Sequence, residues 1–272
     1  MALGSLLPAT ATSAAAPDAS GGEAQRMAAQ LVSAAGAVIG AQATVARMEA
    51  QPAPPVAIDQ VRADLALAQA GFTFRDAIRR EQALVYTLAG RTDIEQATLA
   101  LLTGPGSAGM ASADQALRAL WRLSGFEEGR TVHPRYSKRY AGAEPVDALL
   151  GYYKAAAARS GIDWTYLAAI NYIESDFGRT NGPSSAGALG PMQFLPSTFR
   201  EYGGDGDIMS PHDSIQAAAA LLARNGAPAD YGRALLRYNH SQDYVAAVTA
   251  YAAAIRGDTL WLTRFYYWST YG

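Results

Sequence analysis

The sequence predicts an all-α protein, and three observations support this. Apolar residues recur at spacings of three and four through most of the chain, the period of a helix that buries one face. Helix-capping residues and helix-ending glycines bracket these stretches. Before the last dozen residues, no segment shows the apolar–polar alternation of a half-buried strand. With 272 residues, half of them apolar, the chain is long enough to bury its own core.

The N-terminal residues 1–22 predict a disordered tail or the remnant of an export signal. They are rich in small residues, and no positive charge precedes the short apolar stretch at 2–7, so a signal sequence is incomplete or absent. Residues 27–46 then form a charge-free run of membrane-spanning length. Alanine and glycine dominate this run and polar residues interrupt it, so we expect a packed soluble helix in preference to a membrane span.

Residues 23–125 predict a helical hairpin followed by short helices. Two narrow apolar seams, separated by the proline-rich residues 51–55, predict an antiparallel pair of helices. The first seam consists of Met27, Leu31, Ala34, Val38, Ala41, Val45 and Met48, and the second of Ile58, Val61, Leu65, Ala68 and Phe72, drifting on through Ile78, Val85 and Leu88.

Two short helices are expected next, at about 93–102 and 112–123, the second opened by a capping box from Ser112 to Gln115. Between them, residues 104–109 spell G-x-G-x-x-G, the spacing of a dinucleotide-binding turn. No strand precedes these glycines, so we expect a flexible loop there and no dinucleotide.

Polar residues 124–144 predict a boundary, and residues 145–272 a second domain of shorter helices. The helix Trp164–Ser175 is among them, with Asp163 as its cap. The other expected starts and stops, in chain order, are Pro145, Gly161, Asp213, Asn225, Asp230, Ser241 and Gly257.

Composition excludes several kinds of function. Lys and Arg number 22 against 24 Asp and Glu, which lacks the basic excess of a nucleic-acid binder. The absence of cysteine rules out disulfides, thiolate zinc sites and cysteine nucleophiles. The histidines His133, His212 and His240 show no metal-ligand spacing, so we expect neither a metal nor another cofactor.

Glu174 is the anomaly of the helix Trp164–Ser175. It shares the stripe of Leu167, Ile170 and Asn171, at positions i, i+3, i+4 and i+7. A helical glutamate usually lies on a solvated surface, whereas one on a buried face must be paired or must keep its proton. A carboxyl with a raised pKa is what a general acid needs at neutral pH, so Glu174 is the candidate acid.

Two downstream segments mix small or aromatic residues with polar groups. Residues 182–190 are mostly small, which lets backbone approach a ligand closely, and Gln193 follows between Met192 and Phe194. Residues 238–244 combine aromatic rings with amide and hydroxyl groups. Both patterns suit a sugar, and both also fit an ordinary turn before a helix.

Taken in order, these segments resemble bacterial lytic transglycosylases. E-S-D-F-G at 174–178, Ser184, A-G-A-L-G-P-M-Q at 186–193 and Y-N-H-S at 238–241 follow one another as they do in that family. They look closest to the branch of membrane-bound lytic transglycosylase B and its actinobacterial relatives. The resemblance spans about 146–255, and the aromatic residues 265–271 also resemble some members.

The resemblance implies a lysozyme-like α-helical catalytic domain that binds peptidoglycan glycan strands. It implies that Glu174 is the single acid/base and that Ser184 helps to position the N-acetyl group of the substrate. The other residues that it implies for substrate binding or its support are Met192, Gln193, Tyr238, Asn239 and Tyr244.

The implied reaction cleaves the β-1,4 bond between N-acetylmuramic acid and N-acetylglucosamine and forms a 1,6-anhydromuramic end. Ordinary glycosidases need two carboxyls, but one suffices if the substrate's own N-acetyl group stabilises the transition state. Asp176 is two positions from Glu174 and should point elsewhere on a helix. Residues 203–213 are too short for the EF-hand-like loop of some relatives, so no calcium is expected and Asp205 and Asp207 are turn residues.

Two alternatives stay open: a muramidase that uses the same acid with water, and a non-catalytic peptidoglycan-binding scaffold of an envelope assembly. In either case the N-terminal helices are candidates to bind an envelope protein. Because peptidoglycan lies outside the cytoplasmic membrane, the resemblance implies a secreted or cell-wall-associated protein.

Overall fold

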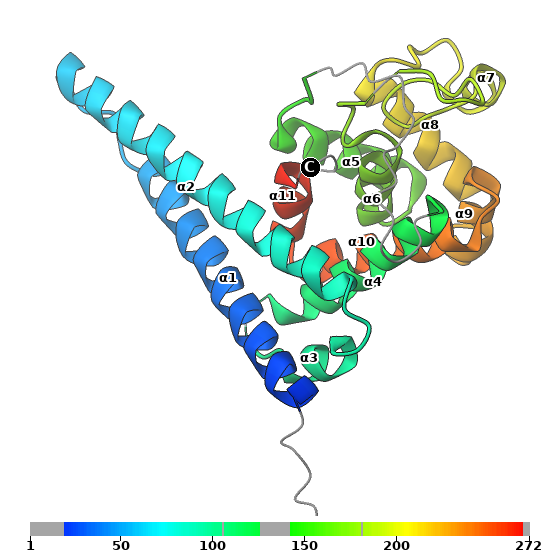
Figure 1. Ribbon diagram of the computed structural model, residues 1–272. Coiled ribbons are helices and arrows are strands. Elements are labelled where there is room, and N and C mark those ends of the chain that lie inside the picture. Colours follow the sequence, from blue (N-terminus) through cyan, green and yellow to red (C-terminus); the bar gives the residue numbers. More distant parts are fainter. Residues whose placement is uncertain (1–18, 105, 126–141, 181, 269–272) are drawn as a thin grey trace, which may run out of the picture.

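The computed structural model describes residues 19–104, 106–125, 142–180 and 182–268, and these residues form an all-α protein (Figure 1). Its helices are α1 (Ala19–Glu49), α2 (Ala57–Ala89), α3 (Glu95–Leu101), α4 (Ser107–Leu123), α5 (Val146–Ser160), α6 (Trp164–Ser175), α7 (Pro196–Gly203), α8 (Pro211–Arg224), α9 (Tyr231–Tyr238), α10 (Gln242–Gly257) and α11 (Leu260–Tyr267). The predicted fold class is confirmed. Leu189 and Phe194 form an isolated antiparallel bridge.

The first two helices form the predicted antiparallel hairpin, which extends away from the globular part (Figure 1). On α1, the seam residues Leu31 and Val38 are fully buried. The hairpin begins earlier than expected, because residues 19–22 of the predicted tail already belong to α1. Residues 1–18 of that tail lie outside the described residues, as do most of the predicted boundary (126–141) and His133.

The predicted seam on the first half of α2 is wrong. Its large members face solvent, with exposed fractions of 56% for Ile58, 61% for Val61, 60% for Leu65 and 64% for Phe72. The half-buried positions there are instead Ala66, Leu67 and Ala70, and α1 is the neighbouring helix along this half (Figure 1). Small side chains allow two helices to approach closely, so α2 turns its alanine-rich face to α1. The later residues Ile78, Val85 and Leu88 are buried.

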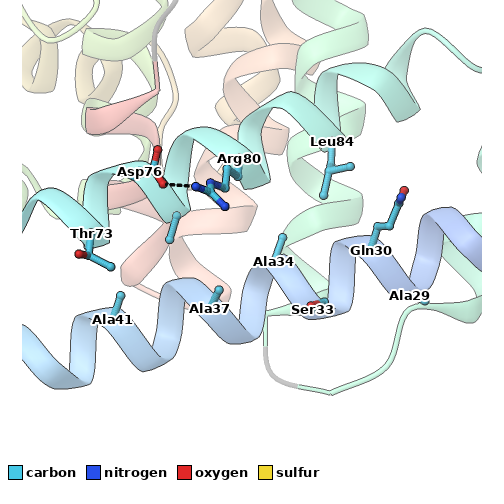
Figure 2. Close-up of a pocket in the computed structure, with 11 residues that line it drawn as sticks. Ala29, Gln30, Ser33, Ala34, Ala37, Ala41, Thr73, Asp76, Arg80 and Leu84 are labelled. Atoms are coloured by element: carbon cyan, nitrogen blue, oxygen red, sulfur yellow. Dashed lines mark ion pairs between the residues drawn. The ribbon is translucent and has the colours of Figure 1, made fainter. Parts of the chain in front are cut away.

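A groove of about 700 Å³ remains between α1 and α2 (Figure 2). Alanines of α1 form most of one wall, and the Asp76–Arg80 ion pair, at 2.8 Å, lies on the α2 side. None of the residues expected to bind substrate lines this groove.

The loop predicted at residues 104–109 is shorter than expected, because residues 107–109 already belong to α4; residue 105 lies outside the described residues. Gly106, with φ of 86°, precedes α4, and Ser107 begins the helix, so the expected capping box at Ser112 lies inside it. Gly109 is in contact with the indole of Trp261, and a Cβ at Gly109 would lie 1.7 Å from the Trp261 Nε1 atom. This glycine is therefore explained by the close packing of Trp261 against α4.

Helix α6 lies at the centre of the globular part, with α5, α8, α10 and α11 packed against it. Its residues from Thr165 to Tyr172 are all buried. Helix α4 packs along α10, where Arg122 pairs with Asp243 at 2.7 Å. The globular part thus includes a helix that the sequence grouped with the hairpin.

Most helix caps in this part are as predicted. Asp163 and Asp230 accept hydrogen bonds from the amides of Thr165 and Arg233, each at 2.9 Å. Ser241 caps α10, and Gly161, in the left-handed conformation, ends α5.

The beginning of α8 and two helices differ from the predictions. Helix α8 begins at Pro211 with Ser210 as its cap, so the predicted Asp213 cap is wrong, because proline at the first helical position leaves no amide to satisfy. Helices α7 and α11 lack a clear seam of their own and were not predicted.

A buried ion pair joins the hairpin to the C-terminal helix. Arg264 of α11 donates through Nε to Glu81 of α2 at 2.8 Å, and both side chains are 0% exposed. The guanidinium also lies over the Trp261 ring, at 4.7 Å from its centroid. Removing one member of a buried pair leaves an uncompensated charge, at a cost of about 3–5 kcal/mol, so this contact fixes where α2 sits on the globular part.

Gly109→Ala should destabilise the protein by about 1–3 kcal/mol, because the new methyl group overlaps the buried indole of Trp261. Urea unfolding followed by circular dichroism measures the change. Gly36→Ala in α1 is the matched control, since a Cβ there meets nothing within 4 Å. The control should be neutral or stabilising by about 0.5–1 kcal/mol. Equal unfolding midpoints for the two variants would contradict the packing role of Gly109.

Candidate active site

Glu174 lies in the last turn of α6, on the stripe that the sequence indicated. Leu167, Ile170 and Asn171 of that stripe are 0% exposed, and Glu174 is half-buried. No basic side chain of the described residues forms an ion pair with it. Burial raises the pKa of Glu174 to about 7, while the nearby Tyr244 hydroxyl acts as a donor to lower it. Of the two alternatives, a paired or a protonated carboxyl, the structure supports the protonated one.

The chain leaves α6 through a sharp turn. Asp176 and Phe177 have φ values of 51° and 59°, and Gly178 follows with 89°. Non-glycine residues in this conformation cost of order 1–3 kcal/mol and persist where their surroundings fix them. The buried Phe177 ring is fixed by stacking on Tyr172, with ring centroids 5.3 Å apart.

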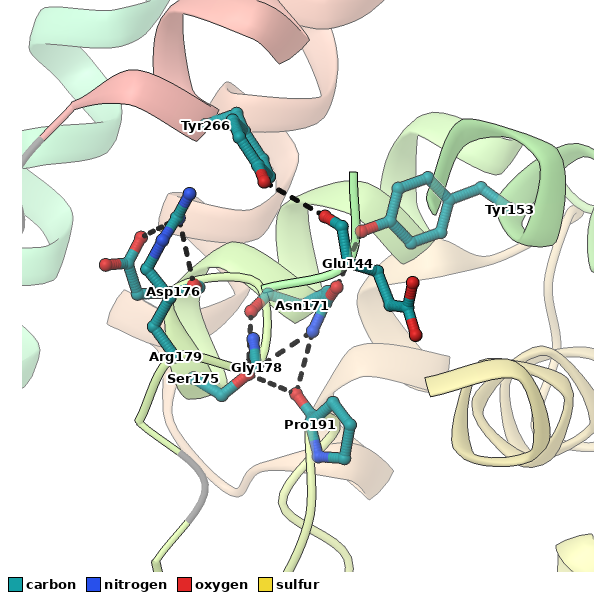
Figure 3. A network of polar contacts seen from close by, with 9 residues as sticks. All are labelled: Glu144, Tyr153, Asn171, Ser175, Asp176, Gly178, Arg179, Pro191 and Tyr266. Carbon is teal, nitrogen blue, oxygen red and sulfur yellow. Dashed lines mark hydrogen bonds and ion pairs between the residues drawn. The ribbon is translucent and has the colours of Figure 1, made fainter. Parts of the chain in front are cut away.

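Asp176 is the carboxyl nearest to Glu174 in sequence, and it is engaged elsewhere. It is 8% exposed and pairs with Arg179 at 3.3 Å (Figure 3). The Arg179 guanidinium in turn lies over the Tyr266 ring, 4.2 Å from its centroid. Asp176 therefore stabilises the turn after α6.

Gln193 is at the tip of a tight turn. Leu189 and Phe194 exchange two backbone hydrogen bonds of 2.8 and 3.0 Å, and Gln193 between them has a φ of 48°. Its Nε2 donates to the carbonyls of Gly190, at 3.0 Å, and Gly182, at 3.3 Å. The side-chain oxygen accepts no hydrogen bond from the described part of the chain, so it is available as an acceptor for a ligand.

Ser184 lies in the neighbouring loop, which Gln193 contacts through Gly182. Its Oγ accepts from the amide of Ala188 at 3.0 Å, and its own amide donates to the Ala188 carbonyl at 2.9 Å. The serine is half-buried, and these bonds hold its hydroxyl at a fixed place in the loop.

Two tyrosines join the Glu174 helix end to the Gln193 turn. The Tyr238 hydroxyl donates to the Met192 carbonyl at 2.7 Å, and its ring is nearly parallel to that of Tyr244, with centroids 6.2 Å apart. Burial, and after it the neighbouring Glu174, raise the pKa of both hydroxyls well above the usual range. The Tyr244 hydroxyl is buried and makes no hydrogen bond of standard geometry with the described residues. It is therefore a donor held close to the acid.

Met192 and Tyr244 do not present side-chain surface to a ligand, since both are 0% exposed. Met192 contributes its carbonyl, which accepts from Tyr238, so of the two roles expected for this residue, lining or support, its position favours support. Asn239 is half-buried at the end of α9, and its side chain forms no hydrogen bond within the described residues. It remains a polar group available at this edge.

Three residues of a buried polar network were not among the expected site residues: Tyr153, Asn171 and Ser175 (Figure 3). The Tyr153 hydroxyl donates to the Asn171 Oδ1 atom at 2.6 Å. Asn171 and Ser175 both donate to the Pro191 carbonyl, at 2.9 and 2.5 Å. The sequence does show two polar residues, Asn171 and Ser175, one helical turn apart on the buried face of α6. It does not show that both bind the carbonyl of Pro191.

Acidic residues near 203–213 act as turn residues. The amide of Asp207 donates to Asp213 Oδ2 at 3.0 Å, and the amide of Met209 donates to Asp207 Oδ1 at 2.8 Å. Among the residues that the structure describes, no group of three histidine or acidic side chains is placed to hold a metal ion.

Comparison with known protein families gives one match: residues 151–264 match the transglycosylase SLT domain. The match extends from α5 into α11 and contains Glu174 and the six residues expected to bind or support substrate. It supports the lytic transglycosylase family and the lysozyme-like all-α fold for this part of the chain. Searches of curated proteins and of solved structures found no match.

Replacing Glu174 by Gln should change how stability depends on pH. In the wild type, the stabilisation from the protonated carboxyl is fully present below about pH 4.5 and is lost as the pH rises through about 7, because burial raises the folded-state pKa. Glutamine keeps the shape and cannot ionise. The urea midpoint of Glu174→Gln relative to wild type should therefore rise across this interval and level off above it. A constant difference at every pH would mean that Glu174 titrates with its ordinary pKa.

Proposed function

We propose that the SLT domain is a peptidoglycan lytic transglycosylase in which Glu174 is the single acid/base. The observation that carries this is the half-buried Glu174 carboxyl, which has a pKa of about 7, forms no ion pair with the part of the chain that the structure describes, and lies near Tyr238 and Tyr244. The SLT match supplies the substrate class, and the site supplies an acid whose pKa of about 7 keeps about half of it protonated at neutral pH.

The reaction needs two proton transfers by one carboxyl. Glu174 first donates its proton to the β-1,4 linkage oxygen as the bond to the anomeric carbon of N-acetylmuramic acid breaks. The carboxylate then takes the proton of that sugar's 6-hydroxyl while the 6-oxygen bonds to the same carbon. The product is a 1,6-anhydromuramic end, no water is consumed, and Glu174 returns to its protonated form. A pKa near 7 suits a group that must both give and take a proton.

The absence of a second acid among the described neighbours favours this reaction over hydrolysis. A two-carboxyl mechanism requires a second carboxyl opposite the first, at about 5–10 Å. No described carboxyl perturbs the pKa of Glu174, and Asp176 is paired with Arg179. The N-acetyl group of the substrate is then the group that stabilises the positive charge developing on the sugar ring.

The groups around Glu174 match what an N-acetylated sugar offers. The Gln193 oxygen can accept from a hydroxyl or an acetamide N–H, Ser184 adds a hydroxyl in the neighbouring loop, and Asn239 adds a side-chain amide at the end of α9. The ring of Tyr238, half-buried above the buried Tyr244, presents an aromatic face. We assign substrate binding to these residues, with Met192 and Tyr244 in support. The resemblance to the membrane-bound lytic transglycosylase B branch stays a prediction.

The substrate places the site of action outside the cytoplasmic membrane. Within the described residues, α1 is the one helix long and apolar enough to cross a membrane, and 22% of that stretch is buried in the structure. Attachment through α1 and export in soluble form are both compatible with this. The exposed apolar residues of α2 and the α1–α2 groove are the surfaces that an envelope protein would use. Such a partner stays a prediction.

Incubation of the purified protein with peptidoglycan, followed by mass spectrometry of the released muropeptides, tests the proposed function. The expected products are lighter by one water than their hydrolysed counterparts. Glu174→Gln should lower turnover by about 10²- to 10⁴-fold or more, because the acid/base is removed while the fold is kept.

The matched control is Glu49→Gln, which neutralises an exposed glutamate at the end of α1 and should leave the rate unchanged. Hydrated reducing ends would establish a muramidase instead. Retention of peptidoglycan in a pull-down without any cleavage would favour the binding scaffold. Full activity of Glu174→Gln would show that another residue is the acid.

A further inference from the structure

We propose that Asn171 and Ser175 are positioning residues, which clamp the Pro191 carbonyl and so hold the Gln193 turn against the helix end that carries Glu174. The proposal rests on the proposed function and extends it to residues that contact no substrate. In Figure 3 both side chains extend from the end of α6 toward Pro191.

The clamp consists of two donors on one acceptor. Asn171 Nδ2 and Ser175 Oγ lie 2.9 and 2.5 Å from the Pro191 oxygen, and the two side chains are 0% and 1% exposed. Pro191 is itself buried. A buried carbonyl that loses its donors is left without hydrogen-bond partners and without water, so the turn is held strongly where the clamp is intact.

Two further contacts fix the direction of both donors. The Tyr153 hydroxyl donates to Asn171 Oδ1 at 2.6 Å, which leaves the Nδ2 side of that amide facing Pro191. The Gly178 amide donates to Ser175 Oγ at 2.8 Å, so the serine accepts from the turn after α6 and donates to the turn before Gln193. Ser175 thus joins two loops in addition to the helix.

The clamp lies where the backbone is strained. Within the described residues, the non-glycine residues with positive φ are Asp176, Phe177 and Gln193. Each lies within two residues of Ser175 or Pro191, the residues that the clamp connects. Strained conformations persist where the surroundings over-determine them, and these hydrogen bonds provide that constraint.

The functional consequence is the relative position of the acid and the sugar-binding turn. Glu174 precedes Ser175 directly, and Gln193 is two residues after Pro191. Without the clamp, the turn keeps its contact from Tyr238 to Met192 and its own backbone bonds, so it should loosen while the domain stays folded. A misplacement of about 1 Å can cost about 10²-fold in rate, and this loss appears mainly in kcat because the substrate contacts themselves are retained.

The test compares Ser175→Ala with Ser214→Ala on soluble, uncrosslinked glycan strands. Ser214 is also fully buried and donates to a backbone carbonyl, that of Ser210 at 2.8 Å, but it belongs to α8 and lies outside the clamp. We expect Ser175→Ala to lower kcat at least about 10-fold with KM changed by less than about 2-fold. Ser214→Ala should leave both constants near the wild-type values. Ser175→Thr, which keeps the hydroxyl, should recover most of the rate.

Amide hydrogen exchange provides a readout that does not depend on activity. In Ser175→Ala, exchange should accelerate at the amides of Gly178, Gln193 and Phe194 and stay unchanged in α8 and α10. Because Asn171 and Ser175 share one acceptor, Asn171→Ala combined with Ser175→Ala should lower kcat by less than the product of the two single effects.

A kcat loss no larger than that of Ser214→Ala, or exchange that accelerates evenly through the domain, overturns the proposal. If the wild type cleaves no peptidoglycan, the proposed function fails, and the exchange experiment still decides whether the clamp holds the turn. Local acceleration at the three amides would support the clamp in that case, and unchanged exchange there would refute it.

Discussion

The structure depends on one constraint: a carboxyl, Glu174, is kept partly out of water, and none of the described cations forms an ion pair with it. Helix α6 satisfies this by being enclosed by α5, α8, α10 and α11, so its last turn is at the edge of the core. Desolvation then favours the protonated acid, and Tyr244 limits the effect as a nearby donor. The helices that bury the core therefore also raise the pKa of Glu174.

The polar groups around this acid are held by buried hydrogen bonds in place of charges. Pro191, Met192 and Gly190 provide carbonyls that accept from Asn171 and Ser175, from Tyr238 and from Gln193. Neutral hydrogen bonds of this kind orient the side chains and carbonyls around Glu174. A charged group in the same place would also shift the pKa of Glu174. The Asp176–Arg179 ion pair instead stabilises the turn that follows α6.

The hairpin is attached to the SLT domain by different means. Its attachment combines the buried Glu81–Arg264 pair with packing of α2 on α4 and α11. Burial raises the pKa of Glu81 and Arg264 opposes the rise, so the pair is stable as long as both members are present. The distal half of α2 packs on α1, and its apolar outer residues are exposed among the described residues. The half of α2 near the SLT domain is thus the half that attaches the hairpin.

The sequence by itself determined most of the helices, most of their caps and the place of the candidate acid, Glu174, on a buried stripe. Caps such as Asp163 and Asp230 act within three residues, and the stripe of Glu174 follows from helical periodicity, so both are local properties. Tertiary structure decided which face of α2 is buried, why Gly109 is a glycine, and which donors hold the Pro191 carbonyl. Those outcomes depend on partners distant in the chain: Trp261 for Gly109, and a turn 16 to 20 residues beyond the clamp residues of α6. The sequence pattern of a helix shows which of its faces could be buried. Which face is buried is decided by the elements that pack against the helix.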